Sequence, residues 1–239
     1  MNTSPVLHPI AAAASRRSFL RQVSFASALF AVPGAFAEGL TRKTARVEEG
    51  PFYPPKLPLD TDNDLIVIND SITPAIGEVT HLSGRLLDMK GDPLRSAVIE
   101  IWEVDSMGVY LADRPRQTSF DANFQGFGRF LTGSSGEYYF RTLKPVRYHG
   151  RQAPHIHLKV KVKGHRDWTT QLFVKGDPGN ERDGVYTRIG DENARASVTV
   201  DFLPLKDSAI GELGARFDIV LGLTPEDADS GDHLPPRRR

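Results

Sequence analysis

Short stretches in which apolar and polar residues alternate recur along this chain. In residues 153–164, APHIHLKVKVKG, every second residue from Ile156 to Val162 is apolar, and the residues between them are His or Lys. Because side chains point to alternate faces of a β-strand, this pattern predicts a strand with one apolar and one polar face. Two histidines, His155 and His157, stand together at the start of the polar face, and that placement needs an explanation.

Seven further runs share this β-rich character and are bounded by turn residues. They cover residues 65–70, 79–88, 97–104, 136–143, 169–177, 196–205 and 215–223. No internal repeat or long pattern of 3.6-residue period accompanies them, so the sequence predicts an all-β fold, an antiparallel β-sandwich. The proline-rich segment 48–60 cannot donate regularly to a ladder and is expected to wrap around the sandwich. The long segment 108–131 is expected to be a functional loop.

The first 37 residues have the features of an export signal. Arg16 and Arg17 precede an apolar run, VSFASALFAVPGAFA, which ends in the small-residue pattern Ala35-Phe36-Ala37. This arrangement predicts a secretory signal at residues 1–37, and the paired arginines resemble a twin-arginine motif, which exports folded proteins. We therefore expect a periplasmic or secreted domain at residues 38–223 with no stable membrane span after cleavage. An ordinary secretory signal and an uncleaved anchor are the alternatives.

Composition narrows the chemistry. Basic and acidic residues number 30 each, and removing residues 1–37, which hold three arginines and no acidic residue, changes the net charge from 0 to −3. No basic excess points to nucleic acid as a partner. With zero cysteines, a metal ion would have to be bound by His, Tyr or carboxylate groups. The polar, proline-rich residues 224–239 are predicted to form a disordered tail.

The histidine pair allows a metal site but does not require one. Residues i and i+2 of a strand lie about 6.5–7 Å apart on one face, so His155 and His157 can bind a single ion, although such pairs also occur as surface residues. Tyr110 and Tyr148, both in loop segments, offer oxygen ligands. Two imidazoles and two phenolates suit a ferric ion, whose charge favours the phenolate form. Packed aromatic side chains would explain the two tyrosines equally well.

An ordered set of motifs resembles the intradiol ring-cleavage dioxygenases, in particular the protocatechuate 3,4-dioxygenase-like branch. The resemblance covers roughly residues 48–185 and includes GPFY, SGRLLDMKGDPLRSAVIEIWEVDSMGVY, GRFLTGSSGEYYFRTLKP, PHIH and TQLFVKGD. It implies a prealbumin-like β-sandwich with long active-site loops and a non-haem Fe(III) cofactor. The large N-terminal helical segment of the catechol 1,2-type branch has no room here, so dimerisation through it is excluded. A monomer and a homo-oligomer of another kind both stay open.

The resemblance assigns roles to individual positions. The implied iron ligands are Tyr110, Tyr148, His155 and His157. Tyr148 would be the ligand that leaves when substrate arrives and that takes one of its protons. Gln171 matches a glutamine beside the substrate, and Tyr53 and Trp102 match positions that line the substrate pocket.

One position departs from the family pattern. The family's arginine stands three residues before the first histidine, where this chain has Gln152, and Arg151 lies one residue earlier. We expect Arg151 to reach the site and, with Gln171, to stabilise negative charge on the substrate. The implied reaction inserts both atoms of O₂ into a catechol-type aromatic ring between its two hydroxyls and yields a cis,cis-muconate-type diacid.

Two other functions fit parts of the sequence. A cupin-like metalloenzyme could use the His-x-His pair, but it would need a further His or carboxylate ligand and would be indifferent to Tyr148. A non-catalytic prealbumin-like β-sandwich could bind a partner or a sugar, and its function would depend on neither iron nor the two histidines.

Overall fold

The computed structural model describes residues 43–69 and 71–222, all within one of the two contact units of the chain, Ala35–Arg239. The predicted signal at residues 1–37 and the predicted tail at residues 224–239 lie outside this part. The strands of the described part are β1 (Val79–Asp88), β2 (Val98–Trp102), β3 (Phe127–Leu131), β4 (Glu137–Leu143), β5 (His155–Lys161), β6 (Trp168–Val174), β7 (Thr199–Val200), β8 (Phe202–Pro204), β9 (Leu213–Arg216) and β10 (Ile219–Leu221). Its helical turns are η1 (Leu111–Arg116), η2 (Asn180–Arg182), η3 (Tyr186–Arg188) and α3 (Glu192–Ala196).

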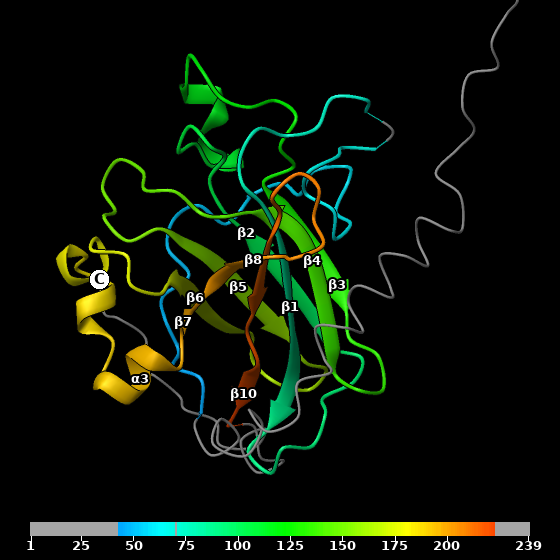
Figure 1. The fold of residues 1–239 in the computed structure, drawn as a ribbon. Coiled ribbons are helices and arrows are strands. Elements are labelled where there is room, and N and C mark those ends of the chain that lie inside the picture. The colour runs from blue at the N-terminus through cyan, green and yellow to red at the C-terminus, as the bar shows by residue number, and fades with distance from the viewer. Residues whose placement is uncertain (1–42, 70, 223–239) are drawn as a thin grey trace, which may run out of the picture. The chain divides into compact units, whose positions relative to one another are not determined.

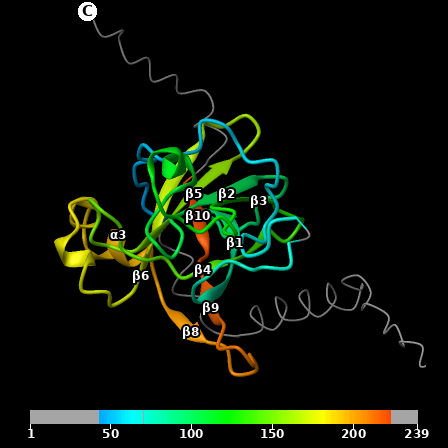
Figure 2. The same cartoon turned by 90° about the horizontal axis from the view of Figure 1, so that it is seen from above.

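Two five-stranded sheets pack face to face, which confirms the predicted β-sandwich (Figures 1 and 2). In the first sheet β1 lies between β4 on one edge and β9 and β10 on the other, and β8 follows β9; the second sheet has the order β3-β2-β5-β6-β7. The sheets are mixed rather than wholly antiparallel, because β9 and β10 run parallel to β1 and β7 runs parallel to β6. Parallel pairing needs a long connection, and the excursion through η2, η3 and α3 supplies one between β6 and β7. None of the described helices is long and apolar enough to cross a membrane.

The apolar faces of the two sheets form the main core. From β5, Ile156, Leu158 and Val160 enter this core and are 0–1% exposed, as the alternating pattern predicts. They pack with apolar side chains of β2 in the same sheet and of β1 and β4 in the facing sheet. The opposite side of β5 carries His155 and His157, so the two histidines lie on the outer face of the second sheet.

Residues 65–69, the described part of the predicted strand at residues 65–70, form no strand, and this prediction is wrong. Leu65 and Ile66 are fully buried in the core, but they lie in an irregular segment. The side chains of Asp62 and Asp64 accept the backbone N–H groups two residues later, at 2.9 and 3.0 Å. Such local side-chain bonds compete with ladder pairing, so an apolar run can be buried without forming a strand.

Residues 47–53, in the segment before β1, lie over the outer face of the second sheet without joining it as a strand, as expected of the proline-rich segment 48–60. Its beginning is tied to β6, because the N–H group of Val47 donates to the carbonyl of Thr169 at 3.1 Å and the carbonyl of Glu48 accepts from Gln171 Nε2 at 2.9 Å. This segment is blue to cyan in Figure 1. It buries the polar side chains of β5 and β6 beneath it, and the predicted site residues are among them.

Candidate metal centre

The four predicted ligands come from three separate parts of the chain. His155 and His157 lie at the start of β5, on its outer face. Tyr110 precedes η1 and pairs through an isolated bridge with Val104, just after β2. Tyr148 belongs to the loop between β4 and β5. The fold brings these four side chains together.

A turn built around Asp105 holds the loop that carries Tyr110. The Asp105 side chain is fully buried, and its Oδ1 accepts two backbone N–H groups of the turn at 2.9 and 3.0 Å. Gly108 in this turn has φ +81°, and a Cβ added there would lie 3.2 Å from the Cβ of Tyr148. The position thus demands both a left-handed backbone and a close approach, which only glycine combines without strain. The turn therefore fixes the two tyrosine loops against each other.

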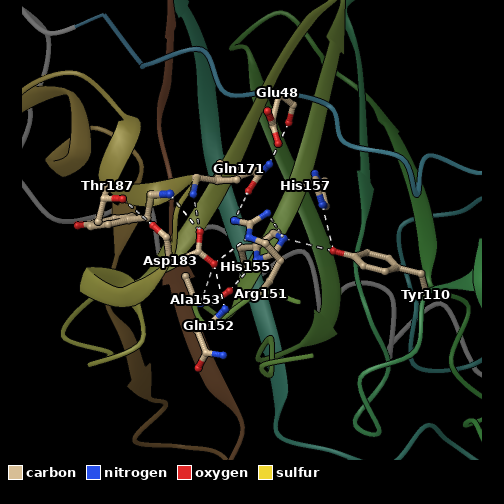
Figure 3. A network of polar contacts seen from close by, with 12 residues as sticks. Glu48, Tyr110, Arg151, Gln152, Ala153, His155, His157, Gln171, Asp183 and Thr187 are labelled. Carbon is tan, nitrogen blue, oxygen red and sulfur yellow. Dashed lines mark hydrogen bonds and ion pairs between the residues drawn. The ribbon is translucent and has the colours of Figure 1, made fainter. Parts of the chain in front are cut away.

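The ring nitrogens of both histidines face the Tyr110 hydroxyl (Figure 3). Tyr110 Oη lies 3.3 Å from His155 Nε2 and 3.0 Å from His157 Nε2. His155 Nδ1 donates to the carbonyl of Ala153 at 2.7 Å; because a carbonyl only accepts, Nε2 is the nitrogen that keeps a free lone pair. The Tyr148 ring completes the group, with its centroid 5.1 Å from that of Tyr110 and 5.8 Å from that of His155.

Burial favours the neutral form of all four groups. It lowers the pKa of His155 to about 3 and holds the pKa of His157 well below its ordinary value. Both imidazoles are therefore in the form that binds metals. Burial raises the pKa of Tyr110 well above its ordinary value and raises that of Tyr148 as well, although the Arg151 charge opposes the shift at Tyr148. A phenolate therefore needs a nearby cation in order to exist here at neutral pH.

This donor set fits a ferric ion. The Nε2 atoms of both histidines lie 3.0–3.3 Å from the phenol oxygen of Tyr110, and a second phenol stands beside them. The described part of the chain contains no group of three or more His, Cys, Asp or Glu side chains that could hold a metal ion. A metal at the histidines thus depends on the tyrosines, which speaks against the cupin-like alternative. Nitrogen and hard phenolate ligands together suit Fe(III) better than a soft ion.

The structure places Arg151, and not Gln152, beside the histidines. Arg151 Nη1 lies 3.4 Å from His155 Nε2, and Nη2 donates to Gln171 Oε1 at 2.9 Å. Figure 3 shows the Gln152 side chain pointing away from this network, and it is exposed. The orientation of the Gln171 amide is fixed, because its Oε1 accepts from Arg151 and its Nε2 donates to the Glu48 carbonyl.

The two predicted pocket residues lie at different distances from the centre. Trp102 stacks on His157, with ring centroids 4.8 Å apart and an interplanar angle of 8°. Tyr53 lies one ring further out, edge-on to Trp102 at 5.1 Å, and its hydroxyl donates to Glu100 Oε2 at 2.9 Å. Trp102 therefore supports a candidate ligand directly, and Tyr53 supports it through Trp102.

Sequence reasoning missed three residues of this region. Phe52 stacks on Tyr110 with ring centroids 4.5 Å apart, and its place inside the GPFY motif was an available signal. Asp183 pairs with Arg151 from the turn between η2 and η3, which no sequence pattern marked. Glu103 is fully buried behind the site, accepts a hydrogen bond from Thr142 Oγ1, and has its pKa raised well above the ordinary value by burial.

Further along the same face of β5 lies a group of charged residues, here named the ionic cluster. Its members are Glu49, Glu100, Arg129, Lys159 and Lys161. Lys159 pairs with Glu49 at 2.7 Å. The fully buried Glu100 pairs with Arg129 at 2.7 Å and with Lys161 at 3.0 Å. Hydrogen bonds from these cations and from Tyr53 outweigh burial and lower the pKa of Glu100.

Comparisons with known proteins agree on one family. A family model described as Dioxygenase matches residues 48–222. The chain is 32% identical over 172 residues to a catechol 1,2-dioxygenase of Acinetobacter baylyi, covering 64% of this chain and 54% of that protein. It is also 32% identical over 156 residues to a protocatechuate 3,4-dioxygenase beta chain of Burkholderia cepacia, covering 61% of this chain and 65% of that protein. The chain thus spans about half to two thirds of the length of these relatives.

A solved structure shows the same fold. The dioxygenase domain of a dioxygenase carbohydrate-binding protein fusion from Streptomyces sp. SirexAA-E superposes with a TM-score of 0.58 at 26% identity. The match covers 77% of this chain and 100% of that one.

Proposed function

This chain belongs to the intradiol ring-cleavage dioxygenase family, and on that premise we propose that it is a non-haem Fe(III) dioxygenase of catechol-type aromatic substrates. With O₂ it would open the ring between the two hydroxyls and release a cis,cis-muconate-type diacid. The observation that carries the proposal is the convergence of two neutral imidazoles on the Tyr110 hydroxyl beside Tyr148.

The candidate ligands divide into fixed and accessible groups. His155, His157 and Tyr110 are 1–2% exposed and held by surrounding contacts, whereas Tyr148 is only partly buried. Bound Fe(III) would supply Lewis acidity and bring the substrate ring and O₂ together. Tyr148 is therefore the residue placed to exchange with substrate and to accept a catechol proton at its Oη. Because burial raises its pKa, a Tyr148 phenolate is a strong base once it no longer binds a metal ion.

Arg151 and Gln171 supply fixed donors at the edge of the centre. The guanidinium charge lies beside His155, and the Gln171 amide is held in one orientation by Arg151 and Glu48. Preformed donors of this kind stabilise charge that develops on a substrate without reorganising during the reaction. Trp102 and Phe52 pack against His157 and Tyr110 and keep water from these ligands.

One sample of purified chain tests the proposal. Iron is quantified, the visible absorption spectrum is recorded with and without catechol under nitrogen, and oxygen uptake and the ring-opened product are then measured. We expect about one iron per chain, a tyrosinate-to-iron absorption band that shifts with catechol, and one O₂ consumed per ring cleaved. A colourless chain that takes up no iron would refute the proposal and favour the non-catalytic binding module.

We further propose that residues 1–37 export the domain at residues 38–223 in folded form. Iron loading before export would explain a twin-arginine signal on a metalloprotein. Cell fractionation of the full chain and of an Arg16→Lys, Arg17→Lys variant tests this. Export of both in equal amounts would contradict the twin-arginine route, and recovery of the wild type only in the cytoplasm would contradict export.

A further inference from the structure

Arg151 reaches the centre by an unusual route. It stands four residues before His155, yet its guanidinium lies against His155 and Gln171 while the Gln152 side chain turns outward. A long, flexible side chain does not hold such a position by itself, because ordering it costs rotamer entropy. A specific partner must therefore fix it.

That partner is Asp183. Arg151 Nε donates to Asp183 Oδ2 at 2.8 Å, and the same oxygen accepts the backbone N–H groups of Gln152 at 3.0 Å and Ala153 at 3.1 Å. One carboxylate oxygen thus holds the Arg151 side chain and the next two main-chain amides. This arrangement turns Arg151 inward and sends Gln152 outward.

Asp183 is itself rigidly placed. Its Oδ1 accepts the backbone N–H groups of Val185 and Tyr186 at 3.0 and 3.1 Å, and the residue is 2% exposed. The turn before it packs directly on the arginine loop, because a Cβ at Gly179 would lie 2.0 Å from the carbonyl oxygen of Gln152. The hydrogen bonds to the carboxylate hold the pKa of Asp183 down to about 2, so it is ionised at neutral pH.

The remaining donors of Arg151 point toward the centre. The bond to Asp183 uses Nε–H and the bond to Gln171 uses one hydrogen of Nη2, while Nη1 faces His155 Nε2. A single lone pair on His155 Nε2 serves either the guanidinium or a metal ion. With that lone pair on a metal, Nη1 keeps both hydrogens for an oxygen atom of a substrate at the centre.

We propose that Asp183 is a positioning residue that acts on the substrate through Arg151, by fixing the guanidinium so that Nη1 donates to a substrate oxygen. This inference rests on the proposed dioxygenase function. It predicts that Asp183 affects turnover and catechol binding only while Arg151 is present.

A double-mutant cycle in the iron-loaded chain tests this prediction. The variants are Asp183→Asn, Arg151→Gln and the double variant, each measured for kcat/KM with catechol, for catechol affinity without oxygen, and for iron content and melting temperature. A hydrogen bond to a charged group predicts a loss of about 10- to 100-fold in kcat/KM for each single variant. We expect the double variant to be no worse than Arg151→Gln, with iron content unchanged.

The matched control is Asp177→Asn. Asp177 lies in the preceding turn and pairs with Arg147 at 2.6 Å, so its substitution removes the same charge from a similar arginine pair. Wild-type kcat/KM is expected for this control. The proposal is overturned if the loss of kcat/KM in the double variant equals the product of the two single losses. It is also overturned if Asp183→Asn loses no more kcat/KM than Asp177→Asn. Either result would show that Asp183 has only a structural role.

A second variant keeps the proposal testable if Asp183→Asn does not fold. Arg151→Lys keeps the positive charge and the four backbone hydrogen bonds to Asp183, but it lacks the planar guanidinium, which can bond Asp183, Gln171 and a substrate oxygen at once. It is expected to lose as much kcat/KM as Arg151→Gln, and wild-type kcat/KM in Arg151→Lys would overturn the proposal. A wild-type chain without iron or ring cleavage would overturn the proposed function as well, whereas an active wild type with multiplying losses overturns this inference alone.

Discussion

The outer face of β5 carries His155 and His157 at one end and Lys159 and Lys161 at the other. Three of these four side chains are buried beneath the segment that precedes β1, and Lys161 is partly covered. At the histidine end, burial lowers the pKa of both imidazoles and keeps them neutral. At the lysine end, Lys159 pairs with Glu49 and Lys161 pairs with Glu100.

This difference shows what distinguishes a site from an equally polar neighbour. In the ionic cluster each charge faces an opposite charge at 2.7–3.0 Å, so the group is complete as it stands. At the candidate metal centre two neutral imidazoles converge on the Tyr110 hydroxyl, and the nearest charge is that of Arg151. Neutral nitrogen and phenol donors that converge on one point, and not charge as such, mark the centre as a place for a metal ion.

The largest expected effect comes from removing one lone pair at the histidine end. His157→Asn should lose stoichiometric iron, and with it ring cleavage should fall to background, because the described residues hold no group of three or more His, Cys, Asp or Glu side chains that could bind the ion instead. Lys161→Met, four residues along the same face, should retain about one iron per chain and its activity. Iron analysis and oxygen uptake of the two variants test this. Equal iron content in both would remove the distinction between the two ends.

The next effect concerns the protonation of the tyrosines and is spectroscopic. Without iron, Tyr110 and Tyr148 should stay protonated at pH values at which a free tyrosine ionises, since burial raises the pKa of both. Adding Fe(III) at pH 7 should produce a tyrosinate-to-iron band, and Tyr110→Phe and Tyr148→Phe should each remove part of it. Tyr139→Phe, at a partly buried tyrosine that bonds His81 in the first sheet, is the control and should leave the band unchanged.

A smaller effect, on stability alone, is expected at the ionic end. Glu100→Gln keeps the shape but removes the charge shared by Arg129 and Lys161, whose side chains are 38% and 35% exposed. Because these cations can turn toward water, the free energy of unfolding should fall by about 1–3 kcal/mol, less than for a fully buried pair. Urea unfolding measures the change. Loss of iron in this variant would mean that the two ends are not independent.

The last effect depends on pH and involves Glu103, behind the histidine end. Its pKa is raised by burial, so the folded chain keeps a proton that the unfolded chain releases above about pH 4.3. Wild-type stability should therefore fall as pH rises from that value toward the folded-state pKa, by up to about 1.4 kcal/mol per pH unit. Glu103→Gln should remove this fall and match the wild type only at low pH. Parallel stability curves for the two chains would show that Glu103 is ionised in the fold.

Local patterns predicted the elements, and the ordered motifs predicted the centre. The alternation in residues 153–164 correctly placed Ile156 and Leu158 in the core and both histidines on the other face. The apolar run at residues 65–70 was wrongly predicted to be a strand, because aspartate side chains accept hydrogen bonds from backbone amides that a strand would use. The parallel placement of β9 and β10 beside β1 had no local signal, since it depends on long connections.

The arginine question shows where sequence reasoning stops. Spacing alone left Arg151 and Gln152 as rivals, and the expectation that Arg151 reaches the histidines agrees with the structure. What decides between them is Asp183, which lies in a distant turn and bonds the backbone of residues 152 and 153. A partner that acts through main-chain amides leaves no pattern in the sequence around it.

The bond between Gln171 and the Glu48 carbonyl joins residues 123 positions apart, and Asp183 lies later still. The turn that orders Arg151 is therefore synthesised after all four candidate ligands. Contacts across such separations also form slowly, because the intervening chain must first be closed into a loop. The contacts that hold Arg151 beside the candidate metal centre therefore form only after residue 183 has been synthesised.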